Sequence, residues 1–444
     1  MRTQLALFIG KISYLIANMM GKKGTAFPGK IAMKIKPDIL KDLAIKCDKI
    51  AIISGTNGKT TTTNLANHVF GKNNIVLSNL NGSNMIQGVI SPFIIDNKKH
   101  YDWGIFEVDE GSIPFVTKYL TPDYLIITNF FRDQLDRFGE VENTINLVHD
   151  SIKNENTILI LNGDDPSSLY FDDLKNPKRY FSQKESFTSK DSQTVTEPSF
   201  CPKCEHKLSY NYINYGNIGK FFCENCGATN NKSDYEITNI KIEEDHYEFS
   251  VSDKKNTSKM KLNLLGTYNL YNALAVISFA RENDYDFNEI KTQIESFENV
   301  DGRMETTTTK DNEIVVVLSK NPVGLSEVLK PIKYDAEKKS IMFILNDYAP
   351  DGRDISWIWD AYFEEINNME NLNKIYCAGT RGEEIALRLK YANIPNEKIK
   401  IYPSKNRSDI EKPINDILKE NKKIYIVGTF TAIPEIRKII LKKK

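Results

Sequence analysis

A glycine-rich turn that carries a lysine, placed between a buried strand and a helix, restricts the fold of this chain more than any other feature. The run Gly55-Thr-Asn-Gly-Lys-Thr60 follows the apolar segment 50–54 and precedes a helical run from Thr61 to about Phe70. This order is typical of a phosphate-binding loop, because glycines let backbone N–H groups approach phosphate oxygens and the helix N-terminus adds positive potential. The alternative is an ordinary glycine turn with a surface lysine.

The loop supplies the side chains that nucleotide binding requires. We expect Lys59 to contact the β- and γ-phosphates of a nucleoside triphosphate and the Thr60 hydroxyl to ligate Mg²⁺. The candidate nucleotide-binding residues in this stretch are Asn57, Gly58, Lys59, Thr60 and Thr61.

Acidic residues follow a second strand candidate, at 103–108. Glu107 ends that strand, and Asp109 and Glu110 come directly after it. A carboxylate at a strand end beside a phosphate loop can hold Mg²⁺ directly or through water. We therefore expect a metal role for Glu107 and consider a substrate or metal role for Asp109 or Glu110. The alternative is a solvated acidic turn.

Four of the six cysteines form two closely spaced pairs, Cys201-Pro-Lys-Cys204 and Cys223-Glu-Asn-Cys226. Four thiolates at this spacing can close a tetrahedral Zn²⁺ site, and six cysteines in 444 residues are too few for a disulfide scaffold. The pattern predicts a structural zinc ribbon, with redox disulfides or inert thiols as alternatives. Because sulfur would fill all four positions, none stays open for catalysis.

Strands alternate with helices twice along the chain, which predicts an α/β fold with two parallel sheets. The second series follows Asp301-Gly-Arg303 and resembles an open Rossmann-like sheet. Its helices are expected to begin near Pro322, Asp360, Gly382, Ser408 and Ala432. We expect an N-terminal helical segment at 1–45, a central nucleotide-binding domain at 46–300 with a ribbon at about 198–230, and a C-terminal domain at 301–444.

The N-terminal segment is predicted to form one amphipathic helix. Its apolar side chains share a face, and these are Leu5, Phe8, Ile12, Leu15, Ile16 and Met19. No run reaches the length of about 18–20 apolar residues that crosses a bilayer. We expect this face to pack on the rest of the protein. The alternative is a face that rests on a membrane surface or a partner.

Five segments together resemble the Mur ligase superfamily, over nearly the whole chain. They are Ser54–Thr62, Thr128–Gly139, Asn162–Pro166, Gly266–Ala275 and Asp301–Arg303. The usual N-terminal nucleotide-sugar domain is missing before the loop, a four-cysteine ribbon interrupts the central domain, and Asp351-Gly-Arg-Asp354 stands in the last domain. This combination is similar to the MurT family within that superfamily, the synthetase subunits of lipid II isoglutaminyl synthases.

The resemblance implies ATP-dependent amidation of the α-carboxylate of D-glutamate in the lipid II stem peptide, through an acyl phosphate. A glutaminase partner of the GatD type would supply ammonia from glutamine, in a heterodimer. ATP and Mg²⁺ are the implied cofactors, with structural Zn²⁺ in the ribbon. The implied location is the cytoplasm, at the inner face of the cell membrane where lipid II resides.

The resemblance also assigns roles to single residues. Asn269 and Asn272 match the asparagine pair that contacts ATP, with Asn272 on the adenine, and Arg303 matches a phosphate contact. Asp354 matches the aspartate that completes the Cys-His pair of the glutaminase across the interface, where it would fix the tautomer of the histidine. The alternative for Asp354 is a helix N-cap ahead of 355–359.

Three other functions remain open at this point. One is a Mur-like or folylpolyglutamate-like ligase that adds a free amino acid. Another is a zinc-ribbon ATPase that binds nucleic acid, although 59 basic and 59 acidic residues give no net positive charge. The third is a catalytically silent scaffold for the glutaminase, which the intact Lys59 and Thr60 disfavour.

Overall fold

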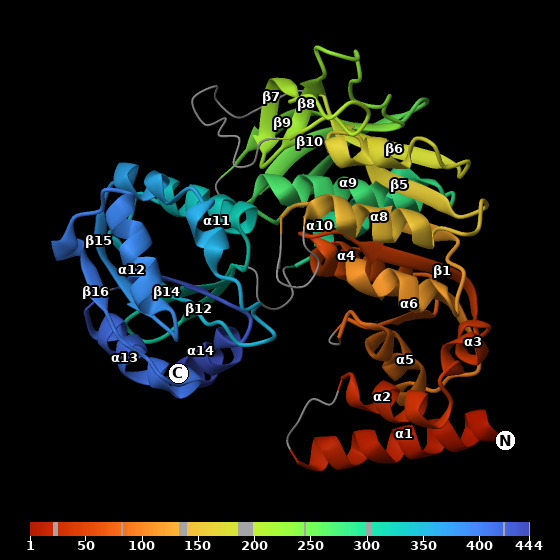
Figure 1. The fold of residues 1–444 in the computed structure, drawn as a ribbon, viewed down its shortest axis with the longest axis horizontal. Coiled ribbons are helices and arrows are strands. Elements are labelled where there is room, and N and C mark those ends of the chain that lie inside the picture. The colour runs from red at the N-terminus through yellow and green to blue at the C-terminus, as the bar shows by residue number, and fades with distance from the viewer. Residues whose placement is uncertain are drawn as a thin grey trace. The chain divides into compact units, whose positions relative to one another are not determined.

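The computed structural model describes residues 1–20, 25–80, 83–132, 140–184, 199–243, 246–298, 304–420 and 422–443. The chain divides into two compact units. The first comprises Met1–Phe131 and Glu140–Glu298, and the second comprises Asn299–Lys444 together with Arg132–Gly139. The expected α/β class is confirmed in both units (Figure 1).

The first unit is built on a sheet with the strand order β11-β10-β9-β6-β5-β4-β1-β3-β2. Pairing is parallel from β2 through β9 and antiparallel between β9, β10 and β11. The strands are β1 (Cys47–Ser54), β2 (Val76–Ser78), β3 (Tyr101–Glu107), β4 (Tyr124–Ile127), β5 (Ile158–Asn162), β6 (Lys178–Gln183), β9 (Tyr235–Ile242), β10 (Tyr247–Ser252) and β11 (Thr257–Leu262).

Helices cover both faces of this sheet, because its central strands are continuous apolar runs that need burial on both sides. Phe70 and Phe279, on α4 and α9, stack with ring centroids 4.4 Å apart and bury one face. The helices of this unit are α1 (Arg2–Met19), α2 (Phe27–Ile35), α3 (Ile39–Ala44), α4 (Lys59–Gly71), α5 (Ile86–Ile95), α6 (Ile113–Thr117), α8 (Val141–Ser151), α9 (Thr267–Arg281) and α10 (Phe287–Ser296). Short 3-10 helices lie at η1 (Glu110–Ser112) and η2 (Pro166–Phe171).

A separate two-stranded hairpin belongs to the same unit. Its strands are β7 (Ser209–Tyr215) and β8 (Ile218–Phe222), and they pair antiparallel. The hairpin lies between the two cysteine pairs in the sequence, so it joins the two halves of the predicted ribbon.

The second unit is a six-stranded sheet with the order β12-β13-β17-β14-β15-β16. All its pairs are parallel except β12 with β13. Its elements are β12 (Glu305–Thr308), β13 (Glu313–Leu318), α11 (Pro322–Tyr334), β14 (Lys339–Ile344), β15 (Leu372–Ala378), α12 (Gly382–Tyr391), η6 (Asn396–Lys398), β16 (Ile399–Ile401), η7 (Arg407–Ile410), α13 (Glu411–Glu420), β17 (Lys423–Gly428) and α14 (Ala432–Leu441).

The prediction that a helix begins near Asp360 is wrong. Two short 3-10 helices, η4 (Ser356–Trp359) and η5 (Phe363–Asn368), flank that position instead. The buried guanidinium of Arg388 donates to the carbonyl oxygens of Ile358 and Ala361, at 3.2 and 2.9 Å. Those carbonyls would accept from the backbone four residues later in an α-helix, so the arginine replaces the helical pattern.

The expectation for the N-terminal helix is wrong about its buried face. α1 packs on its own unit through Ala6, Gly10, Ser13 and Ala17, whereas the large apolar side chains on the predicted face are exposed. Periodicity shows which residues share a face, but small side chains decide which face can approach a neighbouring helix closely. An ideal Cβ on Gly10 would lie 3.0 Å from Ile94 Cδ1, so this position requires a small residue.

Candidate functional site

The predicted phosphate loop connects β1 to α4, and two of its glycines adopt conformations that side chains disfavour. Gly55 has φ +123° and Gly58 has φ +89°. An ideal Cβ on Gly55 would lie 2.3 Å from Thr128 Oγ1, and one on Gly58 would lie 2.1 Å from Asn272 Oδ1. Both backbone strain and space therefore require glycine here.

The contact at Gly58 brings the asparagine pair of α9 to the loop. Asn272 Nδ2 donates to Asn269 Oδ1 at 3.1 Å, and Asn269 Nδ2 donates to the Leu265 carbonyl at 2.7 Å. Both asparagines are buried, so this chain of hydrogen bonds fixes their side-chain amides. The structure thus brings two residues from a distant segment directly to the loop.

The segment after β4 holds the loop in place, a role that the sequence analysis did not assign. Thr128 Oγ1 donates to the Asn57 carbonyl at 2.7 Å, and Asn129 Oδ1 accepts from Asn57 N–H at 2.9 Å. Thr56 N–H donates to the Asn129 carbonyl at 2.9 Å. The motif at 128–139 was recognised, but this contact depends on β4 lying next to β1, which local sequence does not reveal.

Residues 162–165, at the end of β5, hold the segment after β4 in place. Asn162 Nδ2 donates to the Thr128 carbonyl at 3.1 Å, and Asp165 accepts from Phe130 N–H at 2.9 Å. Burial raises the pKa of Asp165 to about 6, although the backbone N–H groups of Phe130 and Ser167 oppose this shift. Asn162 and Asp165 therefore act on the loop through Thr128 and Phe130.

Lys59 lies in the first turn of α4 with its ammonium buried. Its Nζ lies 2.8 Å from Glu110 Oε2 and 4.0 Å from Asp109 Oδ1, and it donates to the Gly55 carbonyl at 2.5 Å. Burial alone would lower the pKa of Lys59, but Glu110, Asp109 and Glu107 together raise it above its usual value. The lysine is therefore a permanent positive charge at the loop.

Glu107 stands at the end of β3, on the strand next to β1. Its backbone N–H donates to Asn79 Oδ1, and its carbonyl accepts from Asn79 Nδ2, both at 2.9 Å. The carboxylate is half-buried, and its charge contributes to the raised pKa of Lys59. Glu107 and the half-buried Thr60 offer oxygen ligands of the type that Mg²⁺ prefers.

Of the two remaining nucleotide-binding candidates, Thr61 is described by the structure and Arg303 is not. Thr61 is buried in the first turn of α4. Arg303, expected to meet the nucleotide phosphates, lies outside the described residues, and so does most of the segment 128–139.

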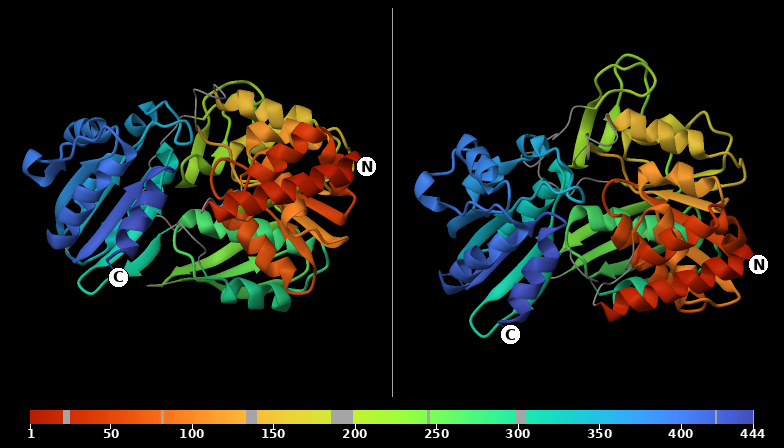
Figure 2. Two further views of the ribbon diagram at one scale, coloured as in Figure 1. Left: turned by 90° about the horizontal axis from the view of Figure 1, so that it is seen from below. Right: turned by 60° about the horizontal axis from the view of Figure 1, so that its bottom comes forward.

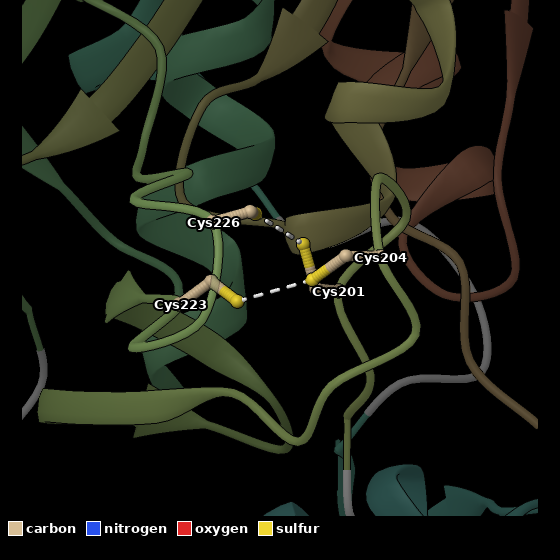
Figure 3. Close-up of side chains that lie close together, drawn as sticks. All are labelled: Cys201, Cys204, Cys223 and Cys226. Carbon is tan, nitrogen blue, oxygen red and sulfur yellow. Dashed lines mark hydrogen bonds between the residues drawn. The ribbon is translucent and has the colours of Figure 1, made fainter.

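The four predicted zinc ligands converge on one point (Figure 3). Cys201 Sγ lies 3.5 Å from Cys226 Sγ, and Cys204 Sγ lies 3.5 Å from Cys223 Sγ. All four sulfurs lie within 4.8 Å of one another. Sulfurs about 2.3 Å from a tetrahedral zinc ion would be about 3.8 Å apart, so the donor set fits Zn²⁺ closely.

The backbone of each cysteine pair turns in the same way. Glu205 N–H donates to the Cys201 carbonyl at 2.8 Å, and Gly227 N–H donates to the Cys223 carbonyl at 3.0 Å. Glu205 has φ +60° and Gly227 has φ +72°. This shared turn directs both cysteines of a pair to one side, which is why the two pairs can form a single site.

Asp164 connects the ribbon hairpin to the nucleotide-binding elements, a role that local sequence does not reveal. Its carboxylate accepts from Tyr271 Oη of α9 at 2.8 Å, from Gln183 N–H at 2.8 Å and from Asn230 Nδ2 at 3.2 Å. Its carbonyl accepts from Gly219 N–H at 2.9 Å. Burial raises the pKa of Asp164 to about 7, against the effect of these donors.

The two aspartates of the segment 351–354 in the second unit have different surroundings. Asp351 is buried and accepts from both the backbone N–H and the hydroxyl of Thr431, each at 2.7 Å. Asp354 is half-buried and accepts from the backbone N–H of Ser356 at 2.8 Å and from its hydroxyl at 3.0 Å. Asp354 lies one residue before Ile355, the N-cap of η4, and its carboxylate reaches the surface.

Comparison with known proteins identifies the family. The chain is 38% identical over 89% of its length to the lipid II isoglutaminyl synthase (glutamine-hydrolyzing) subunit MurT of Staphylococcus aureus (strain COL), of which it covers 89%. It is 35% identical to the subunit of the same name from Streptococcus pneumoniae (strain ATCC BAA-255 / R6), over 100% of this chain and 98% of that protein. The chain belongs to the MurT family.

Family models agree with this membership, and solved structures share the fold. Residues 53–229 match the Mur ligase middle domain, and residues 318–433 match the MurT ligase C-terminal domain. A pseudomurein peptide ligase type C from Methanothermus fervidus has a similar fold, with a TM-score of 0.72 at 23% identity over 92% of this chain and 81% of that one. The MurF ligase from Thermotoga maritima in complex with ADP gives a TM-score of 0.63 at 15% identity, over 93% of this chain and 85% of that one. The expected fold, with a Mur ligase-type central domain, is confirmed.

Proposed function

We propose that this chain is the ATP-dependent synthetase subunit of a lipid II isoglutaminyl synthase. It would amidate the α-carboxylate of D-glutamate in the stem peptide with ammonia from a GatD-type glutaminase, its heterodimer partner. The observation that supports this most is the buried Lys59 in a phosphate loop whose glycine contacts Asn272, in a member of the MurT family.

The loop accounts for the activation step. A carboxylate is a poor electrophile, so the γ-phosphoryl group of ATP is transferred to its oxygen to form an acyl phosphate and release ADP. This transfer depends mainly on positioning and on neutralising the negative charge of the phosphates. Lys59 supplies a positive charge, and α4, which begins at Lys59, would offer the N–H groups of its first turn to the phosphates.

Thr60 and Glu107 would hold Mg²⁺, which neutralises phosphate charge when bound. The two asparagines of α9 would contact the nucleotide, with Asn272 on the adenine, and Arg303 would contact its phosphates. Ammonia then attacks the acyl carbon, the C–O bond to phosphate breaks, inorganic phosphate leaves and the amine nitrogen loses a proton.

The second unit would serve the partner. Asp354 would complete the Cys-His pair of the glutaminase, where its carboxylate fixes the tautomer of the histidine. The structure supports Asp354 over Asp351 for this role, since Asp351 is buried and bonded to Thr431. The four cysteines would hold a structural Zn²⁺, and the chain would work at the inner face of the cell membrane, where its lipid-linked substrate resides.

Measurements of ATP hydrolysis test this function against two alternatives, an amino-acid-adding ligase and a nucleic-acid-dependent ATPase. With the glutaminase and lipid II present, we expect phosphate release to require glutamine or ammonia. Phosphate release driven by free amino acids instead would favour an amino-acid-adding ligase. Stimulation by DNA or RNA, with binding that weakens steeply with salt, would favour a nucleic-acid-dependent ATPase.

A further inference from the structure

The outer face of α1 is apolar and exposed. In Figure 1 and in the right view of Figure 2 the helix lies along the edge of its own unit, and Phe8 is 65% and Met19 89% exposed. The exposed apolar side chains of α1 are Leu5, Phe8, Ile12, Leu15, Ile16 and Met19. They recur at spacings of three and four residues, so they form one continuous stripe along the helix.

The inner face of α1 explains why this stripe cannot turn inward. Gly10 lies close to both neighbouring helices, since an ideal Cβ there would be 3.0 Å from Ile94 Cδ1 and 3.3 Å from the Pro28 carbonyl oxygen. Ser13 Oγ donates to the Gly10 carbonyl at 2.7 Å and so leaves no polar group unpaired on this face. The small face is therefore fitted to α2 and α5, and the large side chains are held outward by that packing.

The charge around this stripe has one sign. Residues 1–37 contain seven lysines or arginines and neither aspartate nor glutamate, although the whole chain has equal numbers of basic and acidic residues. In the described part of the chain, the exposed Arg2, Lys11, Lys30 and Lys34 take part in no ion pair. Asp42 of α3 is bound to Lys36 and to Thr3 of α1.

From this combination we infer that α1 docks on an anionic lipid surface, with its axis in the plane of that surface and its apolar stripe among the acyl chains. An apolar stripe on a segment whose charged residues are all basic is the pattern of helices that lie at membrane interfaces, because both area burial and charge favour binding there. Among the described helices, none is long and apolar enough to cross a membrane.

Binding to lipid vesicles tests this surface, in the absence of nucleotide, lipid II and partner. The full-length chain should sediment with vesicles of phosphatidylcholine containing phosphatidylglycerol, bind much less to phosphatidylcholine alone, and dissociate as salt increases. The double variant Phe8→Asp/Ile16→Asp should bind anionic vesicles at least about tenfold more weakly. Because both side chains are exposed, its melting temperature should match that of the wild type.

A matched control is Phe115→Asp, at a phenylalanine of the same unit that is 61% exposed but lies on α6. This variant should bind vesicles like the wild type. Equal binding by the double variant and the wild type would overturn the inference. A wild-type chain that is dimeric while the double variant is monomeric would also overturn it. So would loss of glutaminase binding in the double variant, because each result would show that a protein covers the stripe. Vesicle binding is measured without the amidation reaction, so a failed amidation assay would not change its outcome.

Discussion

The ammonium of Lys59 lies 2.8 Å from the carboxylate of Glu110, inside the unit and beside the phosphate loop. This ion pair explains how a lysine can be buried there without losing its charge, because a buried cation requires a nearby anion. The pair also gives Glu110, in the acidic run after β3, a partner in this structure. Glu107, half-buried at the strand end, stays our candidate for the metal role.

Replacing Lys59 by methionine should abolish lipid II amidation, with a fall of about a thousandfold or more in kcat, because the phosphate charge is no longer neutralised. Amidation assays and analytical ultracentrifugation of the variant with the glutaminase would measure this. Assembly of the complex should persist. A matched control is Lys49→Met on β1, which should keep full activity. Loss of the complex in the Lys59 variant would contradict the assigned role.

Replacing Gly58 by alanine should greatly weaken ATP binding, since a Cβ there would meet Asn272 Oδ1 and would also require a left-handed backbone. The control is Gly71→Ala at the end of the same helix, where an added Cβ has no neighbour within 4 Å. That variant should be more stable by about 0.5–1 kcal/mol and bind ATP normally. Calorimetric titration with ATP distinguishes the two, and equal affinities would exclude a tight loop at Gly58.

The purified chain should contain one equivalent of zinc, and Cys223→Ser should lower both the zinc content and the melting temperature. The site of four thiolates loses one ligand in this variant, and the ribbon hairpin is anchored to α9, where Asn214 Nδ2 donates to Tyr271 Oη at 2.7 Å. Elemental analysis and thermal unfolding would measure the two effects. Cys47→Ala removes a buried cysteine outside the cluster and should keep the zinc. Full zinc content in the Cys223 variant would count against the site.

The stability of the first unit should depend on the ionisation of Asp164. Its pKa is raised to about 7, whereas an aspartate in the unfolded chain titrates near 4. The folded state therefore holds a proton that the unfolded state has lost between about pH 4 and 7, so the stabilisation from this group is full at low pH and declines as the pH rises through that range.

Asp164→Asn cannot titrate, which isolates this effect. As the pH rises from 4 to 7, the wild type should lose about 1–3 kcal/mol of free energy of unfolding relative to this variant. Urea unfolding at a series of pH values measures the difference. A difference that stays constant across this range would show that Asp164 is ionised throughout.

Asp354→Asn should reduce glutamine hydrolysis in the mixed complex by about a hundredfold or more, because the histidine of the partner would lose the carboxylate that orients it. The asparagine keeps an acceptor for Ser356 N–H, so the local turn should survive. The control Asp360→Asn alters an exposed aspartate at the end of η4 and should leave glutamine turnover unchanged. Unchanged hydrolysis with Asp354→Asn would reduce this residue to a helix cap.

Local sequence predicted the features whose chemistry is contained in one short segment. The glycines around Lys59 and the spacing of the four cysteines identify their sites without knowledge of the fold. The supporting contacts of Thr128 and Asp164 could not be predicted in this way, because each depends on which strands are neighbours in the sheet. For α1, the helical period identified the stripe correctly, but the small residues on the opposite face determined the packing.

The most direct test of the proposed function is mass spectrometry of lipid II incubated with this chain, its glutaminase partner, ATP and glutamine labelled with heavy nitrogen in the side-chain amide. The account predicts that one hydroxyl of the stem peptide is replaced by a labelled amino group, located by fragmentation on the α-carboxyl of D-glutamate. Omitting ATP, or using the Lys59→Met variant, should prevent this change. Lipid II recovered unmodified from the complete reaction, or carrying a whole added amino acid, would contradict it.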